Sequence, residues 1–147
     1  MNKLTIYLAG EIHSDWRVAL RAELERRDLP VEFVGPQEVH DRSDSVGEDV
    51  LGEQPGNRYR DLVGAGINTL RTRVMMRRAD IVVAYFGERF KQWNTAADAG
   101  AAVASGIPLI LVRDSDLSHA LKEIDAMASA TVESLEQAAE VIAYIFE

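Results

Sequence analysis

The sequence predicts an α/β fold: a single doubly wound, flavodoxin- or Rossmann-like domain with a parallel five-stranded sheet and helices on both faces. Short apolar runs alternate with segments of helical periodicity along the 147 residues, which is the pattern of strand–helix–strand units. Two of these runs, residues 81–86 and 109–112, are almost entirely apolar, as strands covered on both faces are. We expect residues 1–147 to form one domain whose strands lie in the order 2-1-3-4-5.

The N-terminal half contains two predicted strands and two predicted helices. Residues 3–9 (KLTIYLA) form the first strand. Ser14 can cap a helix that runs to about Arg27, because apolar side chains follow at four-residue steps. Residues 31–34 form a short second strand, and residues 58–78 carry apolar residues at helical spacing.

The C-terminal half continues this alternation. Its last helix begins with Ser134-x-x-Gln137, a capping box in which each side chain satisfies a free backbone N–H. In order, the expected elements are strand 81–86, a small-residue helix ending before Gly106, strand 109–112, helix 117–128, strand 130–133 and a helix to about Phe146.

The segment 35–57 shows no clean periodicity beyond a helical turn at 46–51, and it is longer than most loops of compact domains. It is acidic, whereas the helix that follows carries four arginines from Arg71 to Arg78, so we expect the two segments to pair. One interpretation is a loop pinned by salt bridges. The other is a lid that closes over a polar ligand, with Arg71 reaching a phosphate.

The composition excludes several classes of function. The chain has no Cys, so disulfides, thiolate metal sites and Cys nucleophiles are ruled out. A formal net charge of −8 argues against a nucleic-acid binder, which needs cationic surface to displace counterions. The sequence shows no cationic-then-apolar leader and no apolar run of about 18 residues, so we expect a cytoplasmic protein without membrane contact.

Polar residues gather where the predicted strands end, which in an open parallel sheet is the edge that binds ligands. Asp98 is the main candidate, because it is the only ionisable residue between Lys91 and Arg113. We expect it in the first turn or so of the small-residue helix, where the macrodipole favours a carboxylate. The candidate ligand contacts around it are Gly10, His13, Gln37, His40, Asp41, Asn68, Arg71, Trp93 and Asn94.

A metal site could be drawn from Glu38, His40, Asp41 and Asp44. The pattern is weak, because it holds no pair of His four residues apart and no dense Asp loop. Arg42 also lies among these residues, where it would oppose a cation. We therefore expect no metal and no cofactor.

Three parts of the chain resemble the bacterial YtoQ family: residues 7–17, residues 33–44 with 47–55, and residues 86–100. More remotely, the chain is similar to nucleoside 2-deoxyribosyltransferases and related nucleotide N-glycosidases. The segments that match their pattern are Tyr7-Leu8-Ala9-Gly10, Ala79-Asp80 and Asp98-Ala99-Gly100-Ala101-Ala102 followed by Gly106-Ile107-Pro108.

This resemblance implies a role for Asp98. It stands where the relatives have a Glu nucleophile that attacks the anomeric carbon of the sugar, and Tyr7 would hold it by a hydrogen bond. The relatives self-associate, which implies a homo-oligomer here.

Two departures from the relatives' pattern bear on the chemistry. Asp is one methylene shorter than Glu, so its carboxylate stops about 1.5 Å short, and such a misplacement can cost about 100-fold in rate. The relatives also have an Asp about eight residues before that of the Ala-Asp pair, where this chain has Thr72. Cleavage of a glycosidic bond usually takes two carboxylates, so Glu11, Glu38 or Asp41 would have to supply the second.

Three functions are compatible with the sequence. The first is an enzyme that cleaves or transfers the N-glycosidic bond of a nucleoside or nucleotide, with Asp98 as nucleophile or stabiliser of the oxocarbenium-like centre and Tyr7 and Glu11 assisting. The second is a non-catalytic nucleotide-binding or sensing module in which Asp98 accepts hydrogen bonds from a ribose. The third is a structural or interaction domain in which Asp98 only caps its own helix.

Overall fold

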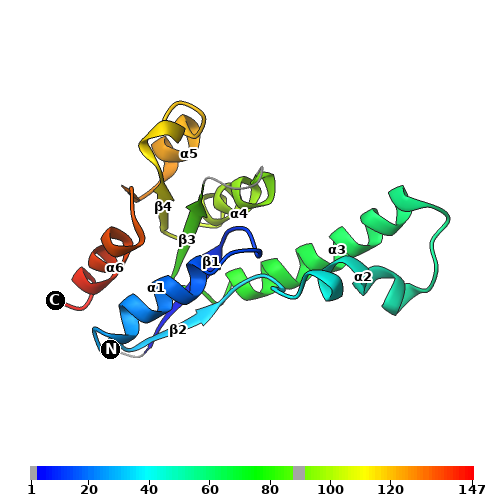
Figure 1. The fold of residues 1–147 in the computed structure, drawn as a ribbon, viewed down its shortest axis with the longest axis horizontal. Helices are drawn as coiled ribbons and strands as arrows, with labels where there is room; N and C mark the ends of the chain where they lie inside the picture. Colours follow the sequence, from blue (N-terminus) through cyan, green and yellow to red (C-terminus); the bar gives the residue numbers. More distant parts are fainter. Residues whose placement is uncertain (1–2, 88–91) are drawn as a thin grey trace.

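Five parallel strands form one sheet in the order β2-β1-β3-β4-β5, which confirms the predicted topology. The structure is a computed structural model that describes residues 3–87 and 92–147 (Figure 1). The strands are β1 (Leu4–Ala9), β2 (Val31–Val34), β3 (Ile81–Phe86), β4 (Leu109–Arg113) and β5 (Ala130–Val132). The helices are α1 (Trp16–Glu25), α2 (His40–Leu51), α3 (Asn57–Met76), α4 (Trp93–Ala104), α5 (Lys122–Met127) and α6 (Leu135–Tyr144), with a 3-10 turn at Ser115–Leu117.

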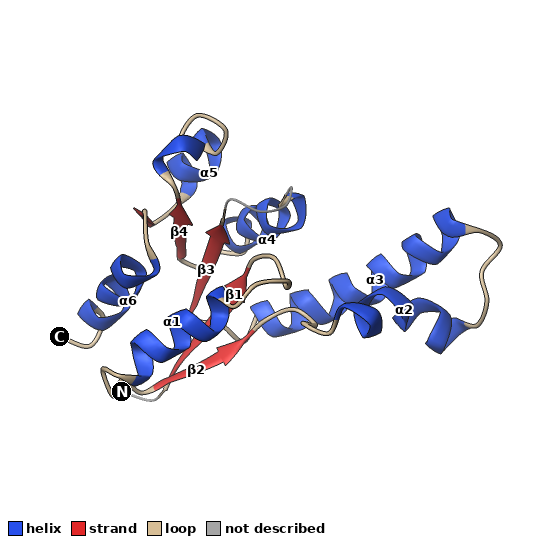
Figure 2. Ribbon diagram, in the orientation of Figure 1, coloured by secondary structure: helices blue, strands red, loops and turns tan. Residues whose placement is uncertain are grey.

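Helices cover both faces of the sheet (Figure 2). Successive strand residues point to opposite faces, so β1 contributes Leu8 to one core and Tyr7 to the other. Helices α1 and α6 pack on the first face, and α4, α5 and the end of α3 pack on the second. The chain therefore changes face between β1 and β3, and ligands bind at such switch points in open sheets.

The segment 35–57 is not the largely irregular loop that we predicted, because residues 40–51 form helix α2. Helices α2 and α3 lie side by side and extend away from the sheet (Figure 1). Gly47 of α2 packs on Gly64 and Val63 of α3 so closely that a Cβ at position 47 would lie 2.6 Å from the Gly64 nitrogen. A helix that packs through a glycine and is otherwise acidic has no apolar stripe, which is why its periodicity was not visible in the sequence.

Polar contacts also join α2 to α3. Arg60 binds Asp44 at 3.1 Å and Glu48 at 3.3 Å. The acidic segment is therefore paired through Arg60, and within the described residues it forms no ion pair with the four arginines from Arg71 to Arg78 that we expected to bind it. Such exposed pairs contribute little to stability. Asn68 donates from Nδ2 to the Ser43 carbonyl at 2.8 Å, and this contact fixes the position of α2 along α3.

We expect Gly47→Ala to lower the free energy of unfolding by about 1–3 kcal/mol, because the added methyl group would force the two helix backbones apart. Gly66→Ala on the same helix pair is the matched control. A Cβ there meets nothing within 4 Å, so helix propensity should raise stability by up to about 1 kcal/mol. Urea unfolding of both variants measures the difference, and equal effects would contradict the tight α2–α3 contact.

Three local differences from the prediction have simple causes. Ser14 does not cap α1, because its hydroxyl donates to Glu11 instead. The predicted helix 117–128 is interrupted and becomes the 3-10 turn and the short α5. The capping box at α6 is present in part, since Ser134 Oγ accepts from the Gln137 N–H at 3.1 Å.

No helix in the described part of the chain is long and apolar enough to cross a membrane.

Candidate active site

A cavity of about 780 Å³ opens beyond the carboxyl end of β1, between the β1–α1 loop, the α2–α3 pair and the start of α4. This volume is in the range of small-molecule sites. The predicted site residues that line it are Gly10, Glu11, His13, Gln37, His40, Asn68, Asn94 and Asp98. Residues from four separate parts of the sequence therefore meet at one cavity.

Four other predicted residues do not line this cavity. Tyr7 lies in the core below it and is fully buried. Asp41 is exposed on α2. Arg71 donates to the Gly35 carbonyl at 2.6 Å and so holds the β2–α2 connection. Trp93 is the first residue of α4 and is 73% exposed.

Asp98 lies on α4 and faces the cavity. The helix begins at Trp93, so Asp98 lies at the start of its second turn, close to the first turn or so that we predicted. Burial raises the pKa of this carboxyl from 3.8 to about 6, although the nearby Arg73 and Arg17 guanidinium groups oppose the shift. At neutral pH the group is therefore mostly ionised but can also take up a proton, as catalytic acids and bases do.

The Tyr7 hydroxyl lies below Asp98. Its pKa is raised to about 12, first because it is buried and second because the Asp98 carboxylate is close. Thr72 is near the hydroxyl, but the geometry gives the hydroxyl no hydrogen-bond partner within the described residues. The predicted hydrogen bond between Tyr7 and Asp98 is thus not formed here, although the two groups are neighbours.

Glu11 organises the β1–α1 loop. Its carboxylate accepts the His13 N–H at 2.6 Å, the Ser14 N–H at 3.0 Å and the Ser14 hydroxyl. Partial burial raises the pKa of Glu11, but these hydrogen bonds outweigh burial and leave the pKa below its usual value. Glu11 is therefore an ionised carboxylate whose lone pairs are largely occupied.

Arg17 holds the same loop from below. It is buried, and its guanidinium donates to the carbonyls of Leu8 at 3.0 Å, Gly10 at 3.0 Å and Glu11 at 2.6 Å. Gly10 is required here because a Cβ would lie 2.8 Å from Cε2 of Trp16. The sequence suggested that Gly10 allows a ligand to approach, and the structure adds that the missing Cβ also lets Trp16 pack against it.

Sequence reasoning missed Arg73. One face of α3 lines the cavity with residues at helical spacing: Asp61, Gly64, Ala65, Asn68, Thr69, Thr72 and Arg73. We had selected Arg71, which the structure turns toward the β2–α2 connection. The signal that could have found Arg73 is its spacing of four from Thr69, because residues three or four apart share a helix face.

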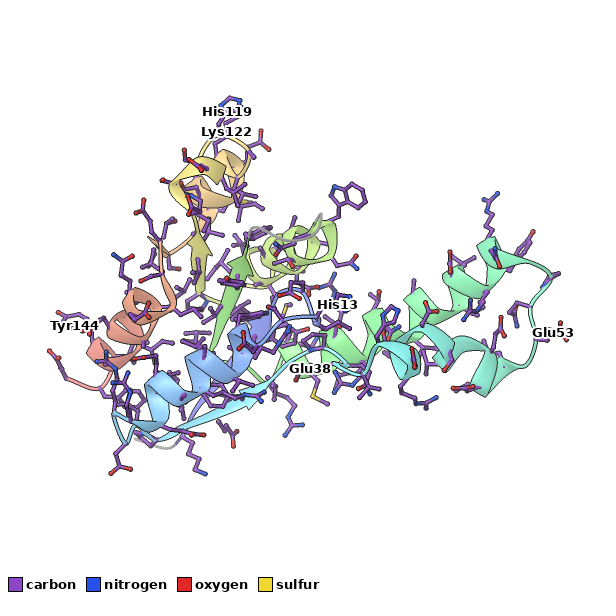
Figure 3. All side chains as sticks on the ribbon, viewed as in Figure 1. His13, Glu38, Glu53, His119, Lys122 and Tyr144 are labelled. Atoms are coloured by element: carbon purple, nitrogen blue, oxygen red, sulfur yellow. The ribbon has the colours of Figure 1, made fainter. Side chains whose placement is uncertain are left out.

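His13 and His40 face each other where the sheet meets the α2–α3 pair, with ring centroids 5.3 Å apart. Figure 3 shows His13 and Glu38 at this junction. Glu38 lies 3.8 Å from Arg21. No group of three or more His, Asp or Glu side chains placed to hold a metal occurs within residues 3–87 and 92–147.

Comparison with known proteins identifies the family. The family model described as nucleoside 2-deoxyribosyltransferase YtoQ matches residues 7–146. The chain belongs to the YtoQ family. A YtoQ relative from Bacillus subtilis (strain 168), named uncharacterized protein YtoQ, is 49% identical over 142 residues, which are 97% of this chain and 96% of the relative.

Two solved structures resemble this YtoQ-family chain. A 2-deoxyribosyltransferase from Bacillus psychrosaccharolyticus has a TM-score of 0.54 at 20% identity, covering 92% of this chain and 90% of that one. A conserved protein from Enterococcus faecalis V583 has a TM-score of 0.56 at 16% identity, covering 94% of this chain and 96% of that one. At these identities the likeness shows that this chain has the fold of the two solved structures.

Proposed function

We propose that the chain cleaves or transfers the N-glycosidic bond of a nucleoside or nucleotide. One observation carries the proposal: Asp98 is a partly buried carboxylate, poised near neutral pH, that lines a cavity large enough for a nucleoside. The cavity lies at the switch point of the sheet, where the fold binds ligands. The family model's description and the 2-deoxyribosyltransferase with the same fold support this choice of chemistry.

In the proposed reaction an Asp98 oxygen attacks C1′ of the sugar while the C1′–N bond breaks. The base leaves with the bonding electron pair and takes a proton from water. In hydrolysis a water molecule then attacks C1′ and loses a proton, the bond from C1′ to the Asp98 oxygen breaks, and the free sugar is released. In transfer a second base attacks C1′ and loses a proton instead, so that a new nucleoside is released. Either step restores the Asp98 carboxylate. Tyr7, directly below, is the group that we propose to hold Asp98 in place when the substrate is bound.

Of the three acids predicted as the second carboxylate, only Glu11 lines the cavity. Its carboxylate is ionised and accepts hydrogen bonds from the loop. An ionised carboxylate stabilises positive charge on an oxocarbenium-like sugar better than it donates a proton. We therefore propose that Glu11 acts electrostatically and keeps the loop in position.

The remaining lining residues that we predicted supply contacts for the rest of the substrate: His13, Gln37, His40, Asn68 and Asn94 with the backbone of Gly10. All carry groups that hydrogen-bond bases or sugar hydroxyls. We propose a small-molecule substrate met in the cytoplasm and no nucleic-acid partner, in keeping with the net charge of −8.

The test is a panel of nucleosides, 2′-deoxynucleosides and their 5′-monophosphates, each incubated with the purified chain. Liquid chromatography follows release of free base, and a second base added to the mixture reveals transfer. Release or exchange of base that increases with protein concentration supports the proposal. A panel that binds, as shown by a thermal shift, but yields no base would contradict it.

The sensing alternative has an observation in its favour. Of the two predicted catalytic carboxylates that line the cavity, Glu11 already accepts hydrogen bonds from its own loop, which leaves Asp98 alone to act on the substrate. A sensor would hold the sugar hydroxyls against Asp98 and stop there. Thermal stabilisation by a nucleotide without turnover is the result that selects this function over the enzyme.

We also propose that the chain self-associates through the α2–α3 pair. Its exposed apolar residues are Val39, Val50, Leu51, Tyr59, Leu62, Leu70 and Val74. Leu62 and Leu70 are 64% and 66% exposed and lie two turns apart on α3, on one side of the helix. Such a stripe on a projecting helix pair is typical of an interface.

We expect the double variant Leu62→Glu/Leu70→Glu to dissociate this assembly at micromolar concentration, because it places two charges in the apolar contact. Light scattering coupled to size-exclusion chromatography measures the mass. Val18→Glu is the matched control, since Val18 on α1 is 65% exposed but lies outside the pair. A wild-type chain that is monomeric at all concentrations would overturn the proposal.

A further inference from the structure

Two polar groups that line the inner end of the cavity, and one in the core just below it, have unused hydrogen-bonding capacity. The Tyr7 hydroxyl is buried and has no partner within the described residues, and the same holds for Nη1 of Arg73. The Asp98 carboxylate accepts no hydrogen bond and forms no ion pair with any residue that the structure describes. Buried polar groups in native proteins are nearly always paired, so the Tyr7 hydroxyl and Arg73 Nη1 each lack an expected partner.

The three groups come from separate elements that meet only at this place. Tyr7 is on β1, Arg73 on α3 and Asp98 on α4. Arg73 and Asp98 both line the cavity. The Asp98 carboxylate raises the pKa of Tyr7, and the Arg73 guanidinium lowers the pKa of Asp98, so both groups lie near Asp98. A ligand bound in the cavity can therefore meet Arg73 and the Asp98 carboxylate together.

The chemistry of these groups restricts that substituent. Arg73 can only donate and the Asp98 carboxylate can only accept, whereas the Tyr7 hydroxyl can do both. A hydroxyl group satisfies a donor and an acceptor at once. An anion would satisfy Arg73 but would face the carboxylates of Glu11, Asp44, Asp61 and Asp98, all of which line the same cavity.

We propose that Arg73 is a specificity-determining residue that donates to the 2′-hydroxyl of the substrate, so that the chain acts on ribonucleosides in preference to 2′-deoxyribonucleosides. The inference rests on the proposed function, which places C1′ against Asp98 and hence C2′ next to it. The ring oxygen is the other neighbour of C1′, but it becomes positively charged in the transition state and repels a guanidinium. The 2′-hydroxyl is thus the oxygen that Arg73 can bind without opposing the reaction.

This specificity differs from what the 2-deoxyribosyltransferase of similar fold is named for. A site that hydrogen-bonds a hydroxyl rejects the analogue that lacks it, because the partner groups are then left buried and unpaired. Without the 2′-hydroxyl, Arg73 Nη1 would remain in the state that the structure shows, with no partner in the described part of the chain.

The test compares matched pairs of substrates: adenosine, cytidine, guanosine and uridine, each against its 2′-deoxy form. We expect kcat/KM for base release to favour the ribo form by at least about 100-fold. Arg73→Met, which keeps the aliphatic length but cannot donate, should bring this ratio close to one by lowering the ribo value. Arg73→Lys should retain part of the ratio, and Arg77→Met, at an exposed position just after α3, is the matched control.

The outcomes separate this inference from the proposed function. Equal rates for both sugars, a preference for the deoxy form, or an Arg73→Met variant that loses both activities equally would overturn the inference alone. A preference for 5′-monophosphates that disappears in Arg73→Met would also overturn it, because Arg73 would then bind phosphate. If no member of either series shifts the melting temperature or loses its base, both the proposed function and the inference fail.

Discussion

Asp98→Asn is expected to reduce the release of free base by at least about 1000-fold while nucleoside binding survives. The amide has the shape of the carboxylate and still hydrogen-bonds, but it cannot attack C1′ or balance the positive charge that develops there. The assay is base release under single-turnover conditions, with binding measured separately by calorimetry. Asp116→Asn, at an exposed position outside the cavity, is the matched control.

The pH dependence of the wild-type reaction gives an independent check on the same group. With a pKa of about 6, Asp98 loses its negative charge as the pH falls through that value. The rate constant kcat/KM should therefore fall about tenfold for each pH unit below 6. If Asp98→Asn retains activity, or if it loses binding and activity together, the nucleophile assignment is wrong.

The fold was predictable because its signals are local. Strands buried on both faces, such as residues 81–86, can be read as apolar runs, and parallel sheets joined by helices allow few topologies. The location of Asp98 followed from its place after such a strand. The turn of α4 on which it lies followed only approximately, because the start of that helix has no capping side chain to mark it.

The composition of the cavity was harder to predict, since it depends on how α3 is rotated. That rotation is fixed by the contact of Gly47 with Gly64 and by the bond from Asn68 to Ser43. Both contacts require α2, which has no apolar period to reveal it. Without α2 the arginines of α3 are indistinguishable, so Arg71 was selected and Arg73 was missed.

The role of Glu11 was obscured for a different reason. An acid in a ligand-binding loop reads as a catalytic candidate, but Glu11-x-x-Ser14 is also a local pattern in which the carboxylate can accept hydrogen bonds from the turn that follows it. The structure shows those hydrogen bonds. Sequence spacing alone does not distinguish a free carboxylate from one that holds its own loop.

Asp98→Asn is also expected to make the folded protein more stable at neutral pH. The pKa of Asp98 is about 6 in the folded chain and 3.8 without the fold. The fold therefore favours the protonated form, and stability that is present below pH 4 is lost as the pH rises through 6. By pH 7–8 the ionised carboxylate costs at most about 3 kcal/mol, and the neutral amide of Asn avoids this cost.

The measurement is the difference in unfolding free energy between Asp98→Asn and wild type from pH 4 to pH 8. We expect it to be near zero at pH 4 and to grow in favour of the variant above pH 6. For Glu11→Gln we expect this difference to favour wild type at neutral pH and to shrink as the pH falls. The pKa of the wild-type Glu11 carboxylate is lowered, so its stabilising contribution is present at neutral pH and is lost as the pH falls.

This comparison also decides between a functional and a structural Asp98. A carboxylate that only caps its helix stabilises the fold when ionised. Because Asn caps about as well as Asp, its replacement by Asn would leave stability at neutral pH unchanged or lower it by up to about 1 kcal/mol. A carboxylate kept in a cavity at a cost to stability is typical of a functional site. An Asp98→Asn variant that is more stable than wild type at pH 8 and inactive at the same pH would be explained only by the proposal that Asp98 is catalytic.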